Sequence, residues 1–198
     1  MTDLLGLVSK LSPAVVATRP RLQLALAWAN VLLQRSAPAR TALDTLDSLL
    51  EATPQDPKIE RIRIEADVAR AVVEIAADRV EGVDDLIAKA LAEPNSVRPW
   101  VVSVAANVSS FASIVRFDFA QARRRQDWAA GVHQRTPGSF GLVYGHCFAG
   151  IAATEQLDIA AAEDHFRIAL QTAETTSGEQ SHSARLASAM LGALLYEL

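Results

Sequence analysis

The chain has 198 residues, of which 50% are hydrophobic, 21% are charged and 6% are aromatic, and its formal net charge is -4 at pH 7. This composition can bury a core, so it excludes intrinsic disorder over most of the length. A net negative charge supplies no global positive field for a phosphate backbone, so we expect no direct binding of nucleic acid by this segment.

The cellular location follows from what the chain lacks. A lone cysteine, Cys147, cannot form an intramolecular disulfide, and no oxidising compartment is needed. The longest uncharged stretch, residues 99–115, carries too many serine and asparagine side chains for a lipid-facing span. The N-terminus shows no basic cluster ahead of a long apolar segment. We therefore expect a cytoplasmic protein with no membrane association.

Alanine and leucine dominate without period-two alternation, which predicts an all-α fold. A helix over residues 21–35 is apolar nearly all round and includes Trp28, as expected of a helix packed on more than one side. A second helix carries Leu43 and Leu46 on one stripe and stops at Thr53-Pro54, since the residue before a proline is disfavoured in a helix. Residues 21–53 are therefore expected to form a helical hairpin.

The same pattern recurs along the rest of the chain. In the next unit the apolar spacing extends as far as Val80 before a break at Glu81-Gly82. Later units have a helix cap at Asp118 and a turn at Gln156-Leu157-Asp158. The sequence predicts one helical-repeat domain over residues 1–198, with further hairpins over 58–94, 98–136 and 140–176 and a final helix over 181–198.

The final helix ends on an apolar sequence that includes Leu194, Leu195, Tyr196 and Leu198. Terminal repeats usually carry a polar capping face, so the pattern predicts that the chain is a fragment of a larger protein.

Small and aromatic residues recur at the spacing of tetratricopeptide repeats (TPRs). Gly150 stands in a first helix, and Ala162, Phe166 and Ala169 follow at the offsets of the TPR consensus. The preceding unit keeps Ala122 and Ala129 but has Gln126 at the aromatic position. Stacked TPR-like antiparallel hairpins predict a right-handed α-superhelix. Gly141, Gly145 and Gly150 are interpreted as points of close helix packing.

Degenerate, alanine-rich and arginine-rich repeats of this spacing resemble the helical-repeat region of MalT-like regulators of the LuxR family, which are ATP-dependent transcription activators. The resemblance is carried by the segment GIAATEQLDIAAAEDHFRIALQTAETTSGEQSHSARLASAMLGALLYEL and by the first hairpin, RLQLALAWANVLLQRSAPARTALDTLDSLL. It implies repeats that sense an inducer or a partner protein and that support self-association.

In such regulators a nucleotide-binding module and a helix-turn-helix flank the repeats. No phosphate-binding GxxxxGK[ST] motif and no basic recognition helix occur in this sequence. The resemblance therefore implies that ATP binding belongs to a module outside this chain, and no cofactor is expected here.

Catalytic and metal-binding constellations are not evident. Nucleophilic catalysis needs a hydroxyl or thiol beside a base, and the GSFG sequence at residues 138–141 lacks the spacing of a nucleophile elbow. Metal ligation would have to use separated residues, since adjacent His146 and Cys147 point to different sides of a helix. The available side chains are His133, His146, Cys147, His165 and His182. We expect neither an enzyme nor a metal site.

Binding candidates come from the repeat register, which places certain side chains of the first helices toward a concave groove. Aromatic residues with a polar atom are efficient contact makers, although core burial is the stronger interpretation for Trp28. Asn107 is favoured only if its surroundings are open. The predicted ligand-binding or partner-binding residues are Trp28, Asn107, Phe111, Tyr144 and Cys147.

The sequence thus predicts a non-catalytic domain of a LuxR/MalT-like regulator that binds a small effector or a partner protein in this groove. The alternative is a stand-alone TPR adaptor that captures a peptide of a partner. An adaptor groove more often carries lysine and arginine for a peptide carboxylate, and Asn107 has no evident basic neighbours, which disfavours this alternative.

Overall fold

The structure is a computed structural model that describes residues 2–51 and 56–198, with side chains from residue 5 onward. Every regular element in the described part of the chain is an α-helix, and no strand occurs there. The predicted all-α class is confirmed. The helix end predicted at Thr53-Pro54 lies outside the described residues. None of the described helices combines the length and the hydropathy that crossing a membrane requires.

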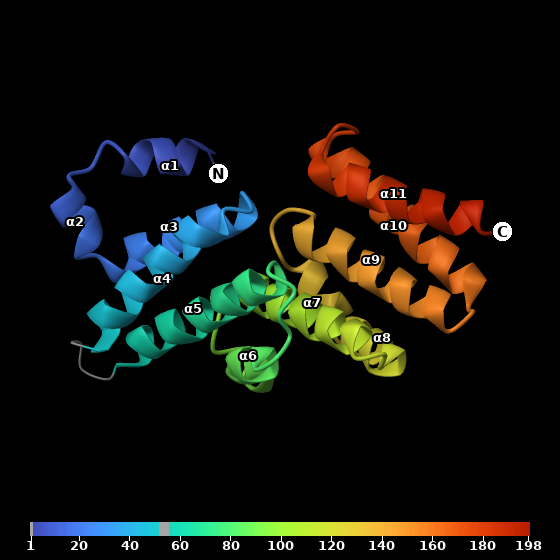
Figure 1. Cartoon of the computed structure of the whole chain (residues 1–198), viewed down its shortest axis with the longest axis horizontal. Coiled ribbons are helices and arrows are strands. Elements are labelled where there is room, and N and C mark those ends of the chain that lie inside the picture. The colour runs from blue at the N-terminus through green and yellow to red at the C-terminus, as the bar shows by residue number, and fades with distance from the viewer. Residues whose placement is uncertain (1, 52–55) are drawn as a thin grey trace. The chain divides into compact units, whose positions relative to one another are not determined.

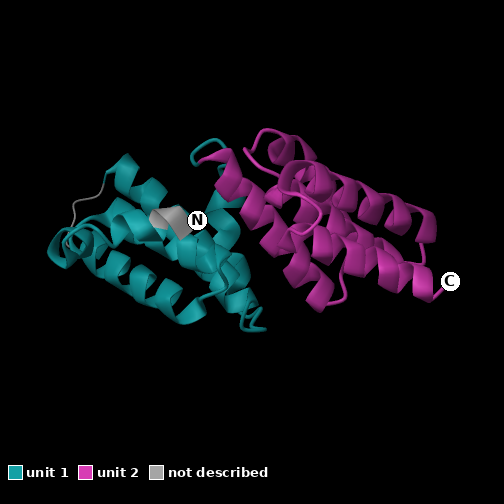
Figure 2. Ribbon diagram, turned by 90° about the horizontal axis from the view of Figure 1, so that it is seen from above, with its two compact units in different colours: residues 1–97 teal, residues 98–198 magenta. Residues whose placement is uncertain are grey.

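The helices fall into two compact units, residues 1–97 and 98–198, which are drawn in separate colours in Figure 2. The helices of the first unit are α1 (Thr2–Val8), α2 (Pro13–Ala17), α3 (Pro20–Leu32), α4 (Ser36–Glu51), α5 (Pro57–Ile75) and α6 (Val83–Ala92). The helices of the second unit are α7 (Pro99–Val115), α8 (Phe119–Gln134), α9 (Phe140–Glu155), α10 (Ile159–Ser177) and α11 (His182–Tyr196).

Consecutive helices pack as antiparallel hairpins inside each unit (Figure 1). In unit 1, α3 pairs with α4 and α5 pairs with α6, while α3 also packs against α5. In unit 2, α9 packs against α7, α8 and α10, and α11 completes the stack against α10. This arrangement is compatible with a helical-repeat superhelix, whose handedness stays a prediction.

The four hairpins share one turn between their two helices. Each turn contains a non-glycine residue with φ between 56° and 62°, and the next residue donates its N–H to the carbonyl five residues earlier, over 2.8 to 3.0 Å. This is the Schellman arrangement, which satisfies carbonyls that the helix end leaves free. The left-handed residues are Gln34, Asp78, Phe117 and Leu157. The same turn therefore recurs in all four hairpins.

Three helices of unit 2 have side-chain N-caps, and the one at Asp118 was predicted from the sequence. Asp118 and Asp158 accept hydrogen bonds from backbone N–H groups in the first turns of α8 and α10. Ser181 does the same at the start of α11. A side-chain oxygen at this position satisfies an N–H that has no partner within the helix.

Two details differ from the sequence-based expectation. The helical spacing that reaches Val80 overstates the length of α5, which ends at Ile75 because Asp78 takes the left-handed conformation. No helix is predicted before Arg21, yet α1 and α2 precede α3. Gln23 holds α2 in place by donating from Nε2 to the carbonyl of Val16 over 2.9 Å.

Small residues allow the helices of unit 2 to approach closely. Ala122, Ala129, Ala162 and Ala169 are fully buried. A Cβ atom at Gly150 would lie 2.5 Å from Cε1 of Phe166, so this aromatic ring occupies the space that a larger residue would need. Close packing at Gly141, Gly145 and Gly150, as predicted, is confirmed.

Candidate functional site

Four aromatic side chains form a half-buried stripe across α7 and α9, which we call the aromatic stripe. Phe140 and Tyr144 stack with ring centroids 4.3 Å apart, and Tyr144 meets Phe148 edge-on at 6.1 Å. Phe111 of α7 meets Phe148 edge-on at 5.8 Å. Residues four apart share one face of a helix, which explains why the three aromatic residues of α9 align.

The aromatic stripe combines apolar area with one polar atom. All four residues are neither fully buried nor fully exposed. Burial raises the pKa of the Tyr144 hydroxyl, with a smaller contribution from Cys147, so this group is neutral and can donate a hydrogen bond near pH 7. Aromatic residues are enriched at binding interfaces, and tyrosine is among those that contribute most to affinity.

A buried polar network joins α7, α8 and α9. Ser103 Oγ lies 2.7 Å from His133 Nδ1, and His133 Nε2 lies 2.9 Å from Gln126 Oε1. Gln126 donates from Nε2 to Asn107 Oδ1 over 3.0 Å, and Asn107 donates from Nδ2 to the carbonyl of Gly141 over 3.1 Å. The network therefore joins α7 and α8 to the first turn of α9.

The hydrogen bonds of this network all run in one direction. The carbonyl of Gly141 can only accept, so it fixes the orientation of the Asn107 amide, which in turn fixes that of Gln126. Gln126 Oε1 then requires a proton on His133 Nε2, and His133 Nδ1 must accept from the Ser103 hydroxyl. Such an arrangement holds a neutral imidazole.

Burial explains why the imidazole of His133 stays neutral. Its side chain is 4% exposed, and desolvation, with a smaller contribution from His146, lowers its pKa to about 4. Ser103 and His133 have the residue types of a nucleophile and a base, but Ser103 is fully buried and the backbone of α9 covers it. No substrate carbonyl can reach this hydroxyl. Ser103 and His133 therefore have a structural role, which is to hold α7 and α8 together.

Two glycines of α9 make room for the network. A Cβ atom at Gly141 would overlap Ser103 Oγ, and one at Gly145 would lie 2.6 Å from Gln126 Oε1. Any larger residue at either place would push α9 away from α7 and α8. The glycines therefore set how deeply the polar side chains are buried.

A pair of histidines, His146 and His165, lies beside the network. His146 Nδ1 is 3.0 Å from His165 Nδ1, which requires one nitrogen to donate and the other to accept. Desolvation lowers the pKa of both imidazoles, to about 4 for His146. They border a cavity of about 80 Å³, which is too small for an organic ligand. Within the described residues no group of three metal-ligating side chains is close enough to hold an ion.

Of the four predicted binding residues in unit 2, the structure brings two together in the aromatic stripe. Phe111 and Tyr144 both belong to the aromatic stripe through Phe148. Asn107 is 4% exposed and is engaged in the network, so the open surroundings on which its candidacy depended are absent. Its polar atoms bond to Gln126 and Gly141.

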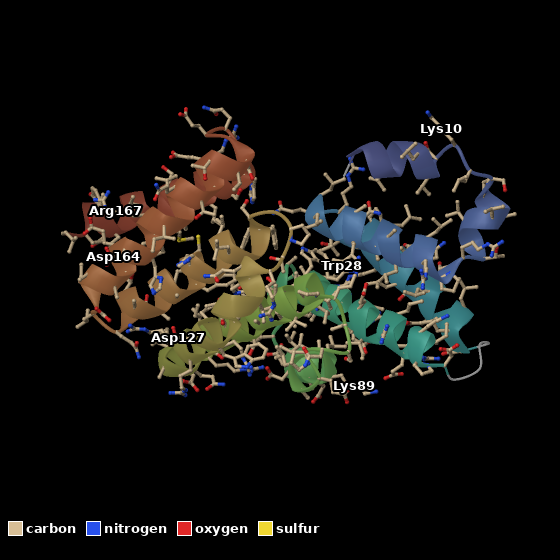
Figure 3. The ribbon with its side chains drawn as sticks, turned by 180° about the vertical axis from the view of Figure 1, so that it is seen from behind. Lys10, Trp28, Lys89, Asp127, Asp164 and Arg167 are labelled. Atoms are coloured by element: carbon tan, nitrogen blue, oxygen red, sulfur yellow. The ribbon has the colours of Figure 1, made fainter. Side chains whose placement is uncertain are left out.

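Cys147 belongs to the core of unit 2, and Trp28 belongs to unit 1. Cys147 is 1% exposed and packs in a core cluster with Val143 and with alanines of α10 and α11, where burial raises the pKa of its thiol to about 12. Trp28 is a buried side chain of α3 in unit 1 (Figure 3). Core burial, the stronger sequence-based interpretation for Trp28, is therefore observed, and ligand contact by either residue stays a prediction.

Sequence reasoning missed half of the aromatic stripe. Phe140 and Phe148 were not among the predicted residues, although their spacing from Tyr144 placed all three on one helical face. The roles of Gln126 and His133 in one network had no comparable signal, because their contact depends on how closely three helices approach.

Comparisons with known proteins give a strong match to a small part of much longer chains. Over 203 aligned residues this chain is 48% identical to the serine/threonine-protein kinase PknK of Mycobacterium tuberculosis and to the PknK of Mycobacterium bovis. The alignment covers all of this chain and 18% of each relative, so the chain spans less than one fifth of their length. No protein-family model and no solved structure matches the chain.

Proposed function

We propose that this chain is a non-catalytic, effector-sensing segment of a longer cytoplasmic regulatory protein, and that its aromatic stripe binds a small ligand or a partner segment. The observation that carries the proposal is the stripe itself. Phe111, Phe140, Tyr144 and Phe148 gather on α7 and α9 and are each partly exposed, and the buried polar network joins the same two helices.

The relatives support a regulatory role inside a multidomain protein. They are serine/threonine-protein kinases by name, and this chain corresponds to 18% of their length. The TPR-like hairpins resemble the sensor region of MalT-like regulators, in which such a segment responds to an inducer. In either a kinase or a transcription activator, the proposed task of this segment is to convert binding into a change elsewhere in the protein.

Binding would act through differential affinity. A ligand that contacts both α7 and α9 favours the hairpin packing that presents the four aromatic residues best. The ligand can shift the conformational equilibrium of the parent protein only by the difference between its affinities for this packing and for the alternative packings of the hairpins. The stripe is aromatic and carries one hydroxyl, so a ligand with an apolar face and a hydrogen-bond acceptor for Tyr144 fits it better than a peptide carboxylate does.

The test is a binding screen with a matched variant. The 198-residue chain is screened against a panel of cytoplasmic metabolites by thermal shift, and each hit is measured by calorimetry. Phe148→Ala removes the ring that joins Phe111 to Tyr144, so we expect at least a tenfold loss of affinity for a true effector. Phe117→Ala removes an aromatic ring that is 80% exposed and outside the stripe, and it should leave affinity unchanged.

Two results contradict the proposal. One is a hit whose affinity is the same in Phe148→Ala as in the unaltered chain. The other is an equal loss of affinity for the hit in Phe148→Ala and in Phe117→Ala.

A further inference from the structure

Helix α11 exposes a face that the equivalent helix of the preceding hairpin buries. That helix is α9, and its Gly150 lies against α10. A Cβ atom at Gly150 would lie 2.5 Å from Cε1 of Phe166, so the ring of α10 rests directly on this glycine. Helix α11 packs against α10 and α9 (Figure 1), yet a Cβ atom at its own Gly192 would meet nothing within 4 Å.

Gly150 and Gly192 hold the same place in their helices. Each lies eleven residues after the residue at the N-cap, which is Ser139 for α9 and Ser181 for α11. The residue two places after each glycine is buried in both helices. By this register α11 corresponds to α9, which is the first helix of a hairpin.

In α9 the face around Gly150 is covered by the second helix of its hairpin. Cys147 packs in one core cluster with Ala169 of α10. Ala153 packs in another core cluster with Phe166 of α10. Small residues on α9 therefore let α10 approach closely, and one aromatic ring fills the remaining space.

The matching face of α11 is open to solvent. Ala189, Gly192 and Leu195 stand at the equivalent positions, and all three are exposed, Leu195 to 46%. Tyr196 beside them is 87% exposed, while Arg185 makes the first turn of this face polar. A glycine inside a helix lowers the stability of that helix, and its use is to permit a close approach. Within the described residues nothing makes that approach to Gly192.

We propose that this face of α11 binds a further helix of the same kind as α10, with an aromatic ring seated on Gly192 and an alanine on either side of the ring. In α10 these residues are Ala162, Phe166 and Ala169. Because α10 follows α9 through a short turn, the expected occupant is the helix that follows α11 in the longer protein. The inference rests on the proposed membership of a longer protein and not on ligand binding by the aromatic stripe.

The test extends the complete chain by a copy of its own second helix. A copy of residues 157–177 is added after Leu198, which stands six residues after Gly192 as Gln156 stands six residues after Gly150. The added helix should cover the open face, so we expect amide hydrogen exchange in α11 to slow by roughly tenfold or more relative to the unextended chain.

Matched leucine variants show whether the added helix docks on Gly192. Gly192→Leu fills the place of the ring, so it should abolish the slowing in the extended chain. Gly131→Leu, at an exposed glycine of α8 whose Cβ would meet only Arg135, at 3.8 Å, should preserve the slowing. Alanine in place of the added copy of Phe166 should also abolish it. An extension that leaves exchange in α11 unchanged, or a slowing that survives Gly192→Leu, overturns the proposal.

A second copy of the chain is the competing occupant. If the unextended chain sediments as a dimer that Gly192→Leu dissociates and Gly131→Leu does not, a second copy covers the face and the proposal is wrong. A monomer whose α11 amides are protected by the extension supports the proposal. Neither measurement uses a small ligand, so a failure of the aromatic stripe to bind an effector would leave this result unaffected.

Discussion

Gln126 and Phe166 occupy equivalent positions of successive hairpins, forty residues apart, and each packs against a glycine of α9. Phe166 fills the space beside Gly150 with an aromatic ring, as the TPR pattern predicts. Gln126 meets Gly145 with an amide that also bonds to Asn107, Ser110 and His133. One position of the repeat therefore serves packing in one hairpin and a polar network in the other.

Gln126→Phe should destabilise unit 2 even though it restores the aromatic residue of the repeat. The ring would leave His133 Nε2 and Asn107 Oδ1 buried without partners, at a cost of about 1–3 kcal/mol for each group. Chemical denaturation monitored by circular dichroism measures the change. Gln134→Phe, at an exposed position of the same helix, is the control and should change the free energy of unfolding little. An increase in stability in Gln126→Phe would show that the network contributes less than the packing.

Acid should destabilise the protein through its buried histidines. The pKa of His133 is lowered to about 4 in the folded chain, so the unfolded chain, with a pKa near 6.5, binds the proton first as the pH falls. Stability is fully present above pH 6.5 and is lost between pH 6.5 and about 4, by up to about 3 kcal/mol for His133. His146 and His165, whose pKa values are also lowered, add to the same trend.

Melting temperatures between pH 7 and pH 4.5 test this trend. His133→Gln keeps a hydrogen-bond donor and cannot take up a proton, so its melting temperature should depend less on pH than that of the unaltered chain. The comparison uses the slope of melting temperature against pH and not the melting temperature itself, because the substitution also alters the hydrogen bonds of the network. An unchanged slope would show that His133 does not titrate on unfolding in this range.

The same glycine-to-alanine change should have opposite effects at two places. Gly150→Ala puts a methyl group 2.5 Å from the Phe166 ring, which is 3% exposed and has little room to move. We expect Gly150→Ala to lower the free energy of unfolding by about 1–3 kcal/mol. Gly192→Ala on α11 meets nothing within 4 Å and should stabilise the helix by about 0.5–1 kcal/mol. A Gly150→Ala variant as stable as the original would contradict the close approach of α9 and α10.

The shared turn between hairpin helices predicts a stabilising substitution. Leu157 has a φ of 60° and is 83% exposed, so its side chain costs conformational energy and contributes little packing. Leu157→Gly should raise the free energy of unfolding by roughly 0.5–1 kcal/mol, because glycine adopts this conformation without strain. Leu195→Gly, inside α11, should lower it. A destabilised Leu157→Gly variant would argue against the left-handed turn.

The sequence was informative wherever local signals decide the structure. Capping residues such as Asp118 and the small residues around Phe166 predicted the hairpins of unit 2 well, because helix ends and close packing leave local patterns. The left-handed turn at Asp78 carried no glycine, so the end of α5 was placed too late.

The candidate sites were predictable only in part, because they depend on contacts between distant segments. Phe111 and Tyr144 were predicted from the repeat register, and the place of Phe148 beside Tyr144 could have been predicted from its helical spacing. The burial of Asn107 could not, since it follows from Gly141 and Gly145 bringing α9 onto α7 and α8.

Ring-resolved nuclear magnetic resonance tests the aromatic stripe most directly. The chain is labelled on its phenylalanine and tyrosine rings and titrated with an effector found in the metabolite screen. The proposed function predicts that the signals of Phe111, Phe140, Tyr144 and Phe148 move together with a single dissociation constant, while that of Phe117 stays in place. Saturation of the chain with no shift in any of these four rings would contradict it.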